Sequence, residues 1–319
     1  MPILSPPHCA GVSTPRGGAS LISRRMAASE VVFHLVAHGC RDLSSMIDLP
    51  TFSDNPMSQG GFSDVYQGYL SDATRLQVAV KTLRISDIDQ DPEHLKRTAR
   101  ELHTWSKCRH PNIVPLLGLA IFRGRIGMVS RWMEKGSLPH YLQRSPNADR
   151  HSLCVQICEG LSYLHRIGIT HGDLKGANIL VSDEGTPALT DFGNSLLMDA
   201  TMKLTQREGE TCSTSLTLRW SAPELITGTR PHTTASDVYA LGMTILETIS
   251  GKHPYYGKSD TTVMFLVVMK KEPPERPEGI TVGHVSTDKI WELLLRCWSH
   301  EPEARPSAVM VTETANEGA

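Results

Sequence analysis

The sequence predicts an α+β fold in two lobes, and three observations support this prediction. The chain has 319 residues, which is more than one hydrophobic core usually organises, so two lobes are expected. After a polar beginning, about eighty residues have the pattern of β-strands, and apolar residues then recur at helical spacing over nearly twice that length. A strand-rich half followed by a helix-rich half is typical of an α+β protein, with a cleft expected between the halves.

The composition is that of an ordinary globular protein. Charged residues make up 21% and hydrophobic residues 39%, and the formal net charge is only −2. No basic run is interleaved with aromatic residues, so we expect no nucleic-acid partner. No apolar run approaches the roughly 18 residues of a membrane span.

The seven cysteines are scattered and include no C-x-x-C pair. This pattern argues against a structural zinc site and favours a reducing compartment, so we expect a cytoplasmic protein. Cys154 and Cys158 would share one helical face, where two small buried hydrophobic side chains are expected rather than a metal pair.

The first 53 residues differ from the rest. Up to Ser29 the chain has no acidic residue and is rich in Ser, Pro and Gly, a composition that cannot bury enough surface to order itself. A mitochondrial transit segment is the alternative, but its apolar residues are sparse for an amphipathic helix. Short apolar runs from Val31 to Leu49 can pack as an extension onto the fold. We therefore expect a disordered or extension segment at 1–53 and a folded domain at 54–319.

The folded part begins with a predicted antiparallel hairpin. The stretches FSDVYQGYL and LQVAVKTLR are rich in β-formers, and the turn-like SDAT separates them. A helix is predicted within PEHLKRTARELHTWSKC, from an apolar stripe formed by Leu95, Thr98, Ala99, Leu102 and Trp105. Glu101 falls at the edge of this stripe, where we expect a side chain that is neither fully buried nor fully exposed.

Three helices are predicted in the second half, because apolar residues recur there every three or four positions. The three stripes are Leu153, Ile157, Leu161 and Leu164; Val238, Leu241, Ile245 and Ile249; and Ile290, Leu293, Leu294 and Cys297. Gly251 is expected to end the second helix. Only 13 residues follow Pro306, barely enough for a last helix, so we expect a chain that is shortened at its C-terminus.

The loop HGDLKGAN carries the candidate chemistry. It places Asp173, Lys175 and Asn178 at fixed offsets, and two short predicted strands, in ILV and ALTDFG, bring Asp191 close to them. Carboxylate and amide oxygens without His or Cys suit magnesium and not zinc. Magnesium held by so few protein oxygens usually bridges to phosphates. Lys81 in VAVK and the glycines of SQGGFSDVY can supply a cation and backbone donors for such phosphates.

Taken together, these motifs resemble those of the eukaryotic protein kinase family, from about Asp54 to the end of the chain. One motif alone would be weak, whereas the complete set in family order is specific. The sequence motifs GGFSDVY and LRWSAPE are similar to those of fungal members of the tyrosine-kinase-like branch. The matching elements are the Gly-rich hairpin from Ser58 to Val65, VAVK, the helix with Glu101, HGDLKGAN, DFG at 191–193, APE at 222–224, SDVYALG and Arg305.

The resemblance implies a bilobal protein-kinase-like fold. Its N-lobe, at 54–132, would hold a small antiparallel sheet and one helix, and its C-lobe, at 133–319, would be larger and mainly α. The implied activity is the transfer of the γ-phosphate of ATP, with Mg²⁺, to hydroxyls of a protein substrate. Lys175 after the catalytic Asp173 is typical of Ser/Thr-directed members. The oligomeric state is not predicted.

The resemblance also implies a role for each matched residue. Asp173 would orient the acceptor hydroxyl and accept its proton, while Lys175 would balance charge on the γ-phosphate. Lys81 would hold the α- and β-phosphates and would be fixed by an ion pair with Glu101. Asn178 and Asp191 would hold magnesium. The nucleotide would contact Ser58, Gly60, Gly61, Val65, Ala79, Lys81, Ser130 and Met133.

Four further matches imply supporting roles. Thr217 corresponds to the threonine that ties the activation segment to the catalytic Asp and Lys in Ser/Thr kinases. Glu224 and Arg305 correspond to a buried ion pair, which we interpret as structural. Asp237 corresponds to a residue that braces the catalytic loop.

Three positions depart from the family pattern. Ser58 and Ser63 stand at the first and third glycines of the phosphate-binding hairpin, so the backbone there is less free and the expectation of tight ATP binding is weakened. Gly172 stands where many members have an arginine that binds an activation-loop phosphate. We therefore expect a non-RD kinase whose activity does not depend strongly on phosphorylation of that loop.

Two alternative functions stay open. One is a pseudokinase, which is a nucleotide-binding scaffold without transfer activity. The altered Gly-rich hairpin suggests it, and a fold alone does not establish an activity. A small-molecule kinase of the aminoglycoside or choline type shares HGD and the offset from Asp173 to Asn178. Such enzymes lack the APE segment and usually have no lysine at the position of Lys175, so the sequence favours a protein acceptor.

Overall fold

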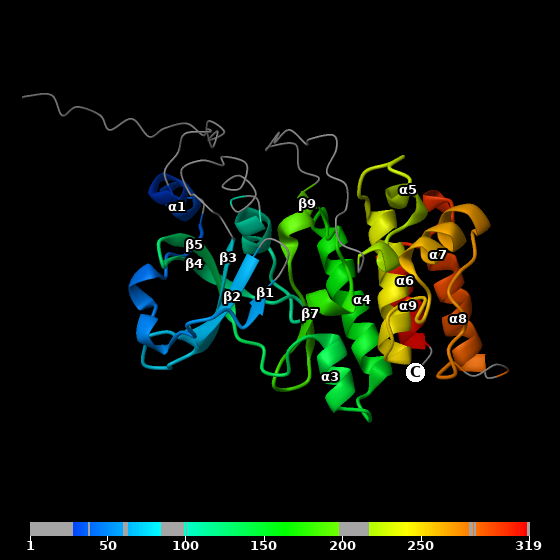
Figure 1. The fold of residues 1–319 in the computed structure, drawn as a ribbon, viewed down its shortest axis with the longest axis horizontal. Helices are drawn as coiled ribbons and strands as arrows, with labels where there is room; N and C mark the ends of the chain where they lie inside the picture. The colour runs from blue at the N-terminus through cyan, green and yellow to red at the C-terminus, as the bar shows by residue number, and fades with distance from the viewer. Residues whose placement is uncertain are drawn as a thin grey trace, which may run out of the picture.

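The chain folds into two lobes in the computed structural model, with the sheet in the first lobe and most helices in the second (Figure 1). The structure describes residues 28–37, 39–59, 63–83, 99, 101–197, 217–280, 283 and 285–317. The predicted α+β architecture, with an antiparallel sheet followed by a helical lobe, is confirmed. Within the described ranges, no helix is both long and apolar enough to cross a membrane.

The smaller lobe is built on a five-stranded antiparallel sheet of order β1-β2-β3-β5-β4. Its strands are β1 (Ser58–Gln59), β2 (Ser63–Tyr69), β3 (Gln77–Leu83), β4 (Leu116–Phe122) and β5 (Arg125–Arg131). The predicted hairpin is confirmed as β2 and β3. Lys81 lies on the central strand, opposite Val65 of β2 and Met128 of β5. Because β3 is paired on both sides, the position of Lys81 is fixed by two ladders of backbone hydrogen bonds.

The residues that precede the sheet also have defined structure. They form α1 (Ala28–Ala37) and two short 3-10 helices, η1 (Ser44–Met46) and η2 (Leu49–Thr51). Leu43 and Phe52 are buried in an apolar cluster with Val78 and Val80 of β3. This segment is therefore packed on the sheet.

The helix predicted after β3 is described only at Ala99 and from Glu101 onward, with helical geometry over 101–106. Ala99, Leu102 and Trp105 are buried, as the apolar stripe predicts. Leu95 and Thr98 lie outside the described residues. The expectation for Glu101 is wrong, because its side chain is only 2% exposed. The Lys81 ammonium lies against it and satisfies the charge of its carboxylate away from water.

The larger lobe is mainly helical. The three predicted stripes lie on α4 (Arg150–Arg166), α6 (Thr234–Ser250) and α8 (Val285–Cys297). Its other elements are α3 (Leu138–Arg144), β6 (Ile169–Thr170), β7 (Ile179–Val181), β8 (Pro187–Leu189), β9 (Leu196–Leu197), α5 (Pro223–Ile226), α7 (Asp260–Met264), a π-helix η6 (Phe265–Lys270) and α9 (Ala308–Glu317). Cys154 and Cys158 of α4 are buried, as expected.

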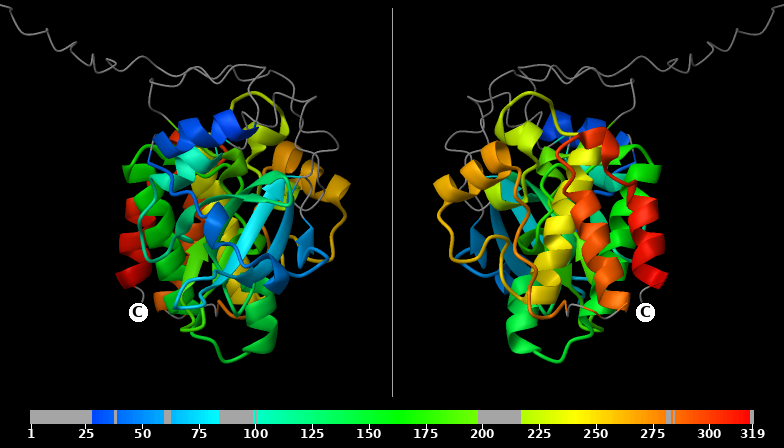
Figure 2. Two further views of the ribbon diagram at one scale, coloured as in Figure 1. Left: turned by 90° about the vertical axis from the view of Figure 1, so that its left-hand side faces the viewer. Right: turned by 90° about the vertical axis from the view of Figure 1, so that its right-hand side faces the viewer.

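Helix α6 is the centre of this lobe. It packs against α4 on one side and α8 on the other, and α9 covers α4 (Figures 1 and 2). A capping box between Thr233 and Ser236 begins the helix, and Gly251, at φ +70°, ends it as predicted. Most side chains of α6 are buried, including Asp237 and Glu247. A central buried helix that carries acidic side chains can fix the elements that surround it.

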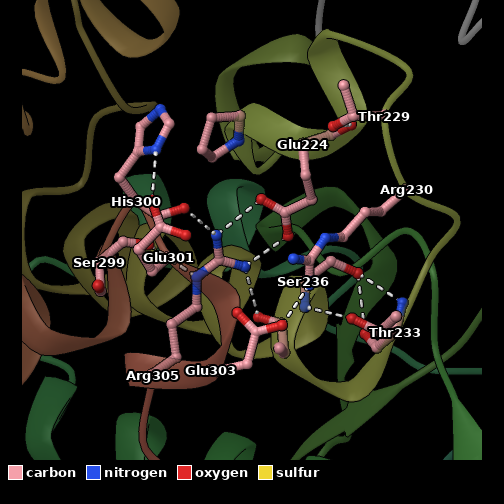
Figure 3. Close-up of polar contacts among 12 residues, drawn as sticks. Glu224, Thr229, Arg230, Thr233, Ser236, Ser299, His300, Glu301, Glu303 and Arg305 are labelled. Atoms are coloured by element: carbon pink, nitrogen blue, oxygen red, sulfur yellow. Dashed lines mark hydrogen bonds and ion pairs between the residues drawn. The ribbon is translucent and has the colours of Figure 1, made fainter.

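A buried ion pair joins α5 to the segment before α9 in the larger lobe (Figure 3). The Arg305 guanidinium donates through Nη1 to Glu224 Oε1 at 2.6 Å and through Nη2 to Glu224 Oε2 at 2.7 Å. It also donates to the backbone oxygens of Ser299 and Ala235. The side chains of Arg305 and Glu224 are 0% and 7% exposed. The pair therefore anchors α5 to the segment before α9, away from solvent.

Replacing Arg305 by alanine should lower the free energy of unfolding by about 3–5 kcal/mol, because Glu224 would stay buried without its partner. Arg230→Ala is the matched control, since Arg230 pairs with Glu303 in the same region and their side chains are 48% and 68% exposed (Figure 3). The control should change the unfolding free energy little. Chemical denaturation measures both, and equal losses in the two variants would contradict a structural role for the buried pair.

Candidate active site

The loop that carries Asp173 runs from β6 into the hairpin of β7 and β8. A single 3-10 turn, η3 (Gly176–Asn178), leads directly into β7, and β7 pairs antiparallel with β8. At the end of this hairpin the backbone N–H of Thr190 donates to the Asn178 carbonyl at 3.0 Å. Asn178 and Asp191 are therefore on neighbouring segments, as the two predicted strands require.

Asp237 of α6 holds the start of this loop. Its Oδ2 accepts from the backbone N–H of His171 at 2.7 Å, and its Oδ1 accepts from that of Gly172 at 2.9 Å. The imidazole of His165 lies 2.9 Å from the same carboxylate. Burial raises the pKa of Asp237, but the hydrogen bond and charge of His165 outweigh it, so that the pKa is lowered overall. The loop thus rests on a charged, buried carboxylate of the central helix.

Gly172 has the conformation that the loop requires. Its φ is +79°, in the left-handed region that favours glycine, and a Cβ placed there would lie 2.5 Å from the backbone oxygen of Asn194. An arginine at this position would need both the backbone and Asn194 to shift. Local backbone geometry therefore explains why glycine occupies this position. As a consequence, the position carries no cationic side chain.

Asp173 is held by two donors from the same loop. Lys175 Nζ lies 3.1 Å and 2.9 Å from its two carboxylate oxygens, and Asn178 Nδ2 donates to Asp173 Oδ2 at 3.0 Å. Lys175 Nζ also donates to Thr217 Oγ1 at 3.0 Å. The Asp173 and Lys175 side chains remain 13% and 16% exposed. The carboxylate is therefore oriented, yet open enough to meet another molecule.

Lys81 connects the two lobes. Its Nζ lies 2.8 Å from Glu101 Oε1 in the smaller lobe and 2.8 Å from Asp191 Oδ1 in the larger lobe. Burial lowers the pKa of Lys81, but the two carboxylates outweigh it and raise the pKa above its ordinary value. Burial likewise raises the pKa of Asp191, and the charge and hydrogen bond of Lys81 lower it in total to about 2. Lys81 and Asp191 are therefore both charged at neutral pH.

An aromatic contact that was not predicted joins the helical segment 101–106 to the loop. Phe192 is buried, and its ring centroid lies 5.8 Å from that of Trp105 and 5.6 Å from that of His171. Trp105 Nε1 also donates to the backbone oxygen of Val114 at 2.6 Å. The position of Trp105 on the apolar stripe, four residues after Glu101, was the one sequence signal for this contact.

Most of the described residues expected to contact a nucleotide lie on the strands around Lys81. Ser58 is opposite Val65 in the β1–β2 pair, and Ala79 is opposite Ser130 in the β3–β5 pair. Ser130 and Met133 are 8% and 7% exposed. Gly60 and Gly61 lie outside the described residues. Four of the expected positions are therefore paired on the same sheet as Lys81.

The donor set fits magnesium and a phosphate-bearing ligand. The Asn178 amide nitrogen donates hydrogen bonds to Asp173, so its side-chain oxygen is the atom available for a cation, and Asp191 lies on the neighbouring segment of the hairpin. These are hard oxygen ligands, which magnesium prefers. Among the described residues no group of three or more His, Cys, Asp and Glu side chains could hold a metal, so a zinc-type site is absent from them. Lys81 supplies the cation that phosphates require.

Glu247 is a second residue that the sequence analysis missed. Its Oε2 accepts from the backbone N–H of Gly176 at 2.9 Å and from Trp220 Nε1 at 3.1 Å. A Cβ on Gly176 would lie 2.6 Å from this carboxylate, so glycine is needed there. Burial raises the pKa of Glu247 to about 7, although the two N–H groups and Lys175 oppose the shift. Glu247 therefore joins the Asp173 loop to the segment that contains Thr217.

Comparisons with known proteins agree with this geometry. A family model described as protein tyrosine and serine/threonine kinase matches residues 53–314. Serine/threonine-protein kinase STY46 of Arabidopsis thaliana is 30% identical over 266 residues, which cover 82% of this chain and 43% of the relative. Cytokinesis protein sepH of Emericella nidulans is 32% identical over 255 residues, which cover 79% of this chain and 18% of the relative.

A tyrosine kinase is among the relatives as well. Proto-oncogene tyrosine-protein kinase ROS of Homo sapiens is 33% identical over 275 residues, which cover 79% of this chain and 11% of the relative. The chain spans less than half the length of these three curated relatives. The family resemblance inferred from the motifs is confirmed. The relatives include both serine/threonine kinases and a tyrosine kinase.

Glu247→Gln should reduce the change in the free energy of unfolding between pH 4.5 and pH 7. The Glu247 carboxyl binds its proton more tightly when folded, with a pKa of about 7 against an ordinary 4.5. Its contribution is therefore full below pH 4.5 and is lost as the pH rises to 7. In the wild type this loss is on the order of 3 kcal/mol, and the glutamine variant should lack it. Denaturant unfolding at pH 5 and pH 8 measures the difference, and parallel profiles of the two proteins would contradict the assignment.

Proposed function

The chain belongs to the protein tyrosine and serine/threonine kinase family, and we propose that it transfers the γ-phosphate of ATP to serine and threonine hydroxyls of protein substrates. The observation that carries the acceptor class is the contact of Lys175 Nζ with both Asp173 and Thr217, at 2.9–3.1 Å. The lysine two residues after the catalytic Asp is typical of Ser/Thr-directed members of the family. The names of the relatives alone leave the acceptor class open, because STY46 and ROS belong to different classes.

In this proposal the residues of the loop position the acceptor. Asp173 accepts a hydrogen bond from the incoming hydroxyl and takes its proton as the new O–P bond forms, while the bond from the γ-phosphorus to the bridging oxygen breaks and ADP leaves. Lys175 lies between Asp173 and Thr217, so it offsets negative charge on the transferring group while it fixes the loop. Neither side chain needs to move far, because each is already held by its neighbours. Catalysis of this kind depends mainly on positioning and on charge neutralisation.

The remaining residues hold the nucleotide in the proposed complex. Lys81 binds the α- and β-phosphates and is kept in place by Glu101. Asn178 and Asp191 would hold Mg²⁺ through their side-chain oxygens. When bound, magnesium neutralises negative charge on the phosphates. The protein supplies the second cation and the fixed oxygen ligands.

Two observations speak against the alternative functions. A pseudokinase usually lacks part of the charged set, whereas here Lys81 contacts both Glu101 and Asp191. A small-molecule kinase lacks the APE segment, whereas Glu224 of that segment is paired with Arg305. A protein substrate is therefore the better supported acceptor. A cytoplasmic location is part of the proposal and is supported by the buried, unpaired cysteines of the described ranges.

The acceptor class can be tested with a peptide library and ATP labelled at the γ-phosphate. We expect label on serine and threonine, with little on tyrosine. Asp173→Asn and Lys81→Met should each lower the transfer rate by about 100-fold or more while the protein stays folded by thermal unfolding. Predominant labelling of tyrosine would contradict the proposed acceptor class. Transfer that survives both substitutions would contradict the proposed site.

We also propose that this is a non-RD kinase whose activity needs no phosphate on the activation segment, since Gly172 offers no cation to bind one. The Ser and Thr residues at 198–216 lie outside the described residues. Phosphatase treatment, with loss of phosphate verified by mass spectrometry, should change the initial transfer rate by less than about twofold. Loss of activity on treatment would show that another cation takes the place of the arginine.

A further inference from the structure

The segment before the β-sheet adds hydrogen bonds to the free edge of β4. The backbone N–H of Leu119 donates to the Arg41 carbonyl at 2.9 Å, and that of Leu43 donates to the Leu119 carbonyl at 2.8 Å. Asp42 thereby forms a parallel bridge with Leu119. The backbone N–H of Ile121 donates to Ser44 Oγ at 2.9 Å. Residues 41–44 therefore close one edge of the sheet.

The same segment then reaches the end of β2. The backbone N–H of Asp48 donates to the Tyr69 carbonyl at 3.1 Å, and the backbone N–H of Tyr69 donates to Thr51 Oγ1 at 3.0 Å. The backbone N–H of Ser53 donates to the Gln67 carbonyl at 3.1 Å. Residues 41–53 are thus fixed on two strands at opposite sides of the sheet, with Leu43 and Phe52 buried between them.

Two strand glycines leave room for this segment. A Cβ on Gly118 of β4 would lie 2.2 Å from the Arg41 carbonyl oxygen, and a Cβ on Gly68 of β2 would lie 2.3 Å from the Phe52 ring. Glycine inside a strand is unfavourable unless another group approaches closely. Both glycines are explained by contact with residues 41–53, so the sequence of the sheet is matched to the segment that covers it.

Helix α1 and Cys40 lie against the helical segment that carries Glu101. Val32, Leu35 and Cys40 are buried in the same apolar cluster as Leu102 and Trp105. The Ser106 hydroxyl lies close enough to the Cys40 thiol to oppose the rise in its pKa that burial causes. Gly39, at φ +94°, ends α1 and turns the chain toward β4. Figures 1 and 2 show α1 next to this helical segment, on the outside of the smaller lobe.

We propose that residues 32–43, which we call the N-terminal clamp, are a positioning element that keeps Glu101 paired with Lys81. The segment 101–106 is a single short helical stretch, so the contact at Ser106 and the apolar cluster shared with Leu102 also set the position of Glu101. The Trp105–Phe192 contact holds this segment on the side that faces the Asp173 loop. Buried side chains of the clamp hold it on the side of α1. The clamp in turn is anchored on β4. Release of the clamp would therefore lower phosphoryl transfer, so docking of this segment can regulate the proposed kinase, on whose function the inference rests.

Two neighbouring residues of α1 provide a matched test in the full-length chain. Leu35 is 5% exposed and Val36 is 40% exposed. Leu35→Asp should undock the clamp, lower kcat for peptide phosphorylation by about tenfold or more, and speed hydrogen exchange of the amides at 101–106. Val36→Asp introduces the same charge on the exposed side and should leave both measurements near the wild-type values. Equal effects of the two variants, or no change in either measurement with Leu35→Asp, would overturn the proposal.

A second comparison separates positioning from simple loss of stability. In a Glu101→Gln background the ion pair with Lys81 is already weakened, so Leu35→Asp should cause little further loss of kcat. If the two losses multiply, the clamp does not act through Glu101 and the proposal is wrong. The hydrogen-exchange measurement needs no acceptor, so it tests the clamp even if the proposed Ser/Thr specificity fails.

Discussion

The structure of the site depends on one ammonium group placed between two carboxylates. Lys81 Nζ lies 2.8 Å from Glu101 and 2.8 Å from Asp191, which belong to different lobes. The Glu101 side chain is only 2% exposed, so its charge is tolerated only while Lys81 is beside it. The strand that carries Lys81 is central in the sheet and cannot shift without breaking two ladders. The relative position of the lobes and the charge state of the site are thus coupled through one side chain.

The second constraint is the buried acidic face of α6. Asp237 holds the backbone of the loop at His171 and Gly172, and Glu247 holds it at Gly176. The residues between these positions include Asp173 and Lys175. Their backbone is therefore held at both ends by hydrogen bonds to the same helix. Buried carboxylates are unfavourable in a core unless N–H groups or cations satisfy them. Here the groups that satisfy them include backbone N–H groups of the loop, so the same hydrogen bonds stabilise the core and place Asp173 and Lys175.

Much of this arrangement could be predicted from the sequence, because its signals are local. The β2–β3 hairpin, the apolar stripes of α4, α6 and α8, and the strands around HGDLKGAN follow from periodicity and turn residues. The burial of Glu101, the contact of Trp105 with Phe192 and the bridge made by Glu247 could not be predicted in this way. Each depends on a partner far away in the chain, and the local pattern around Glu101 indicated a half-buried position at the edge of the apolar stripe. The fit of Gly68 and Gly118 to residues 41–53 became visible only when the two segments were placed together.

The central claim is that Asp191 and Lys81 form one binding site for a metal-bound triphosphate. The most direct test is calorimetric titration of ATP with and without Mg²⁺ into the wild-type chain and into Asp191→Asn. The account predicts that magnesium strengthens binding by about tenfold or more in the wild type and has little effect in the variant, which should still bind metal-free ATP through Lys81. Equal affinity with and without magnesium in the wild type, or an unchanged magnesium effect in Asp191→Asn, would contradict it.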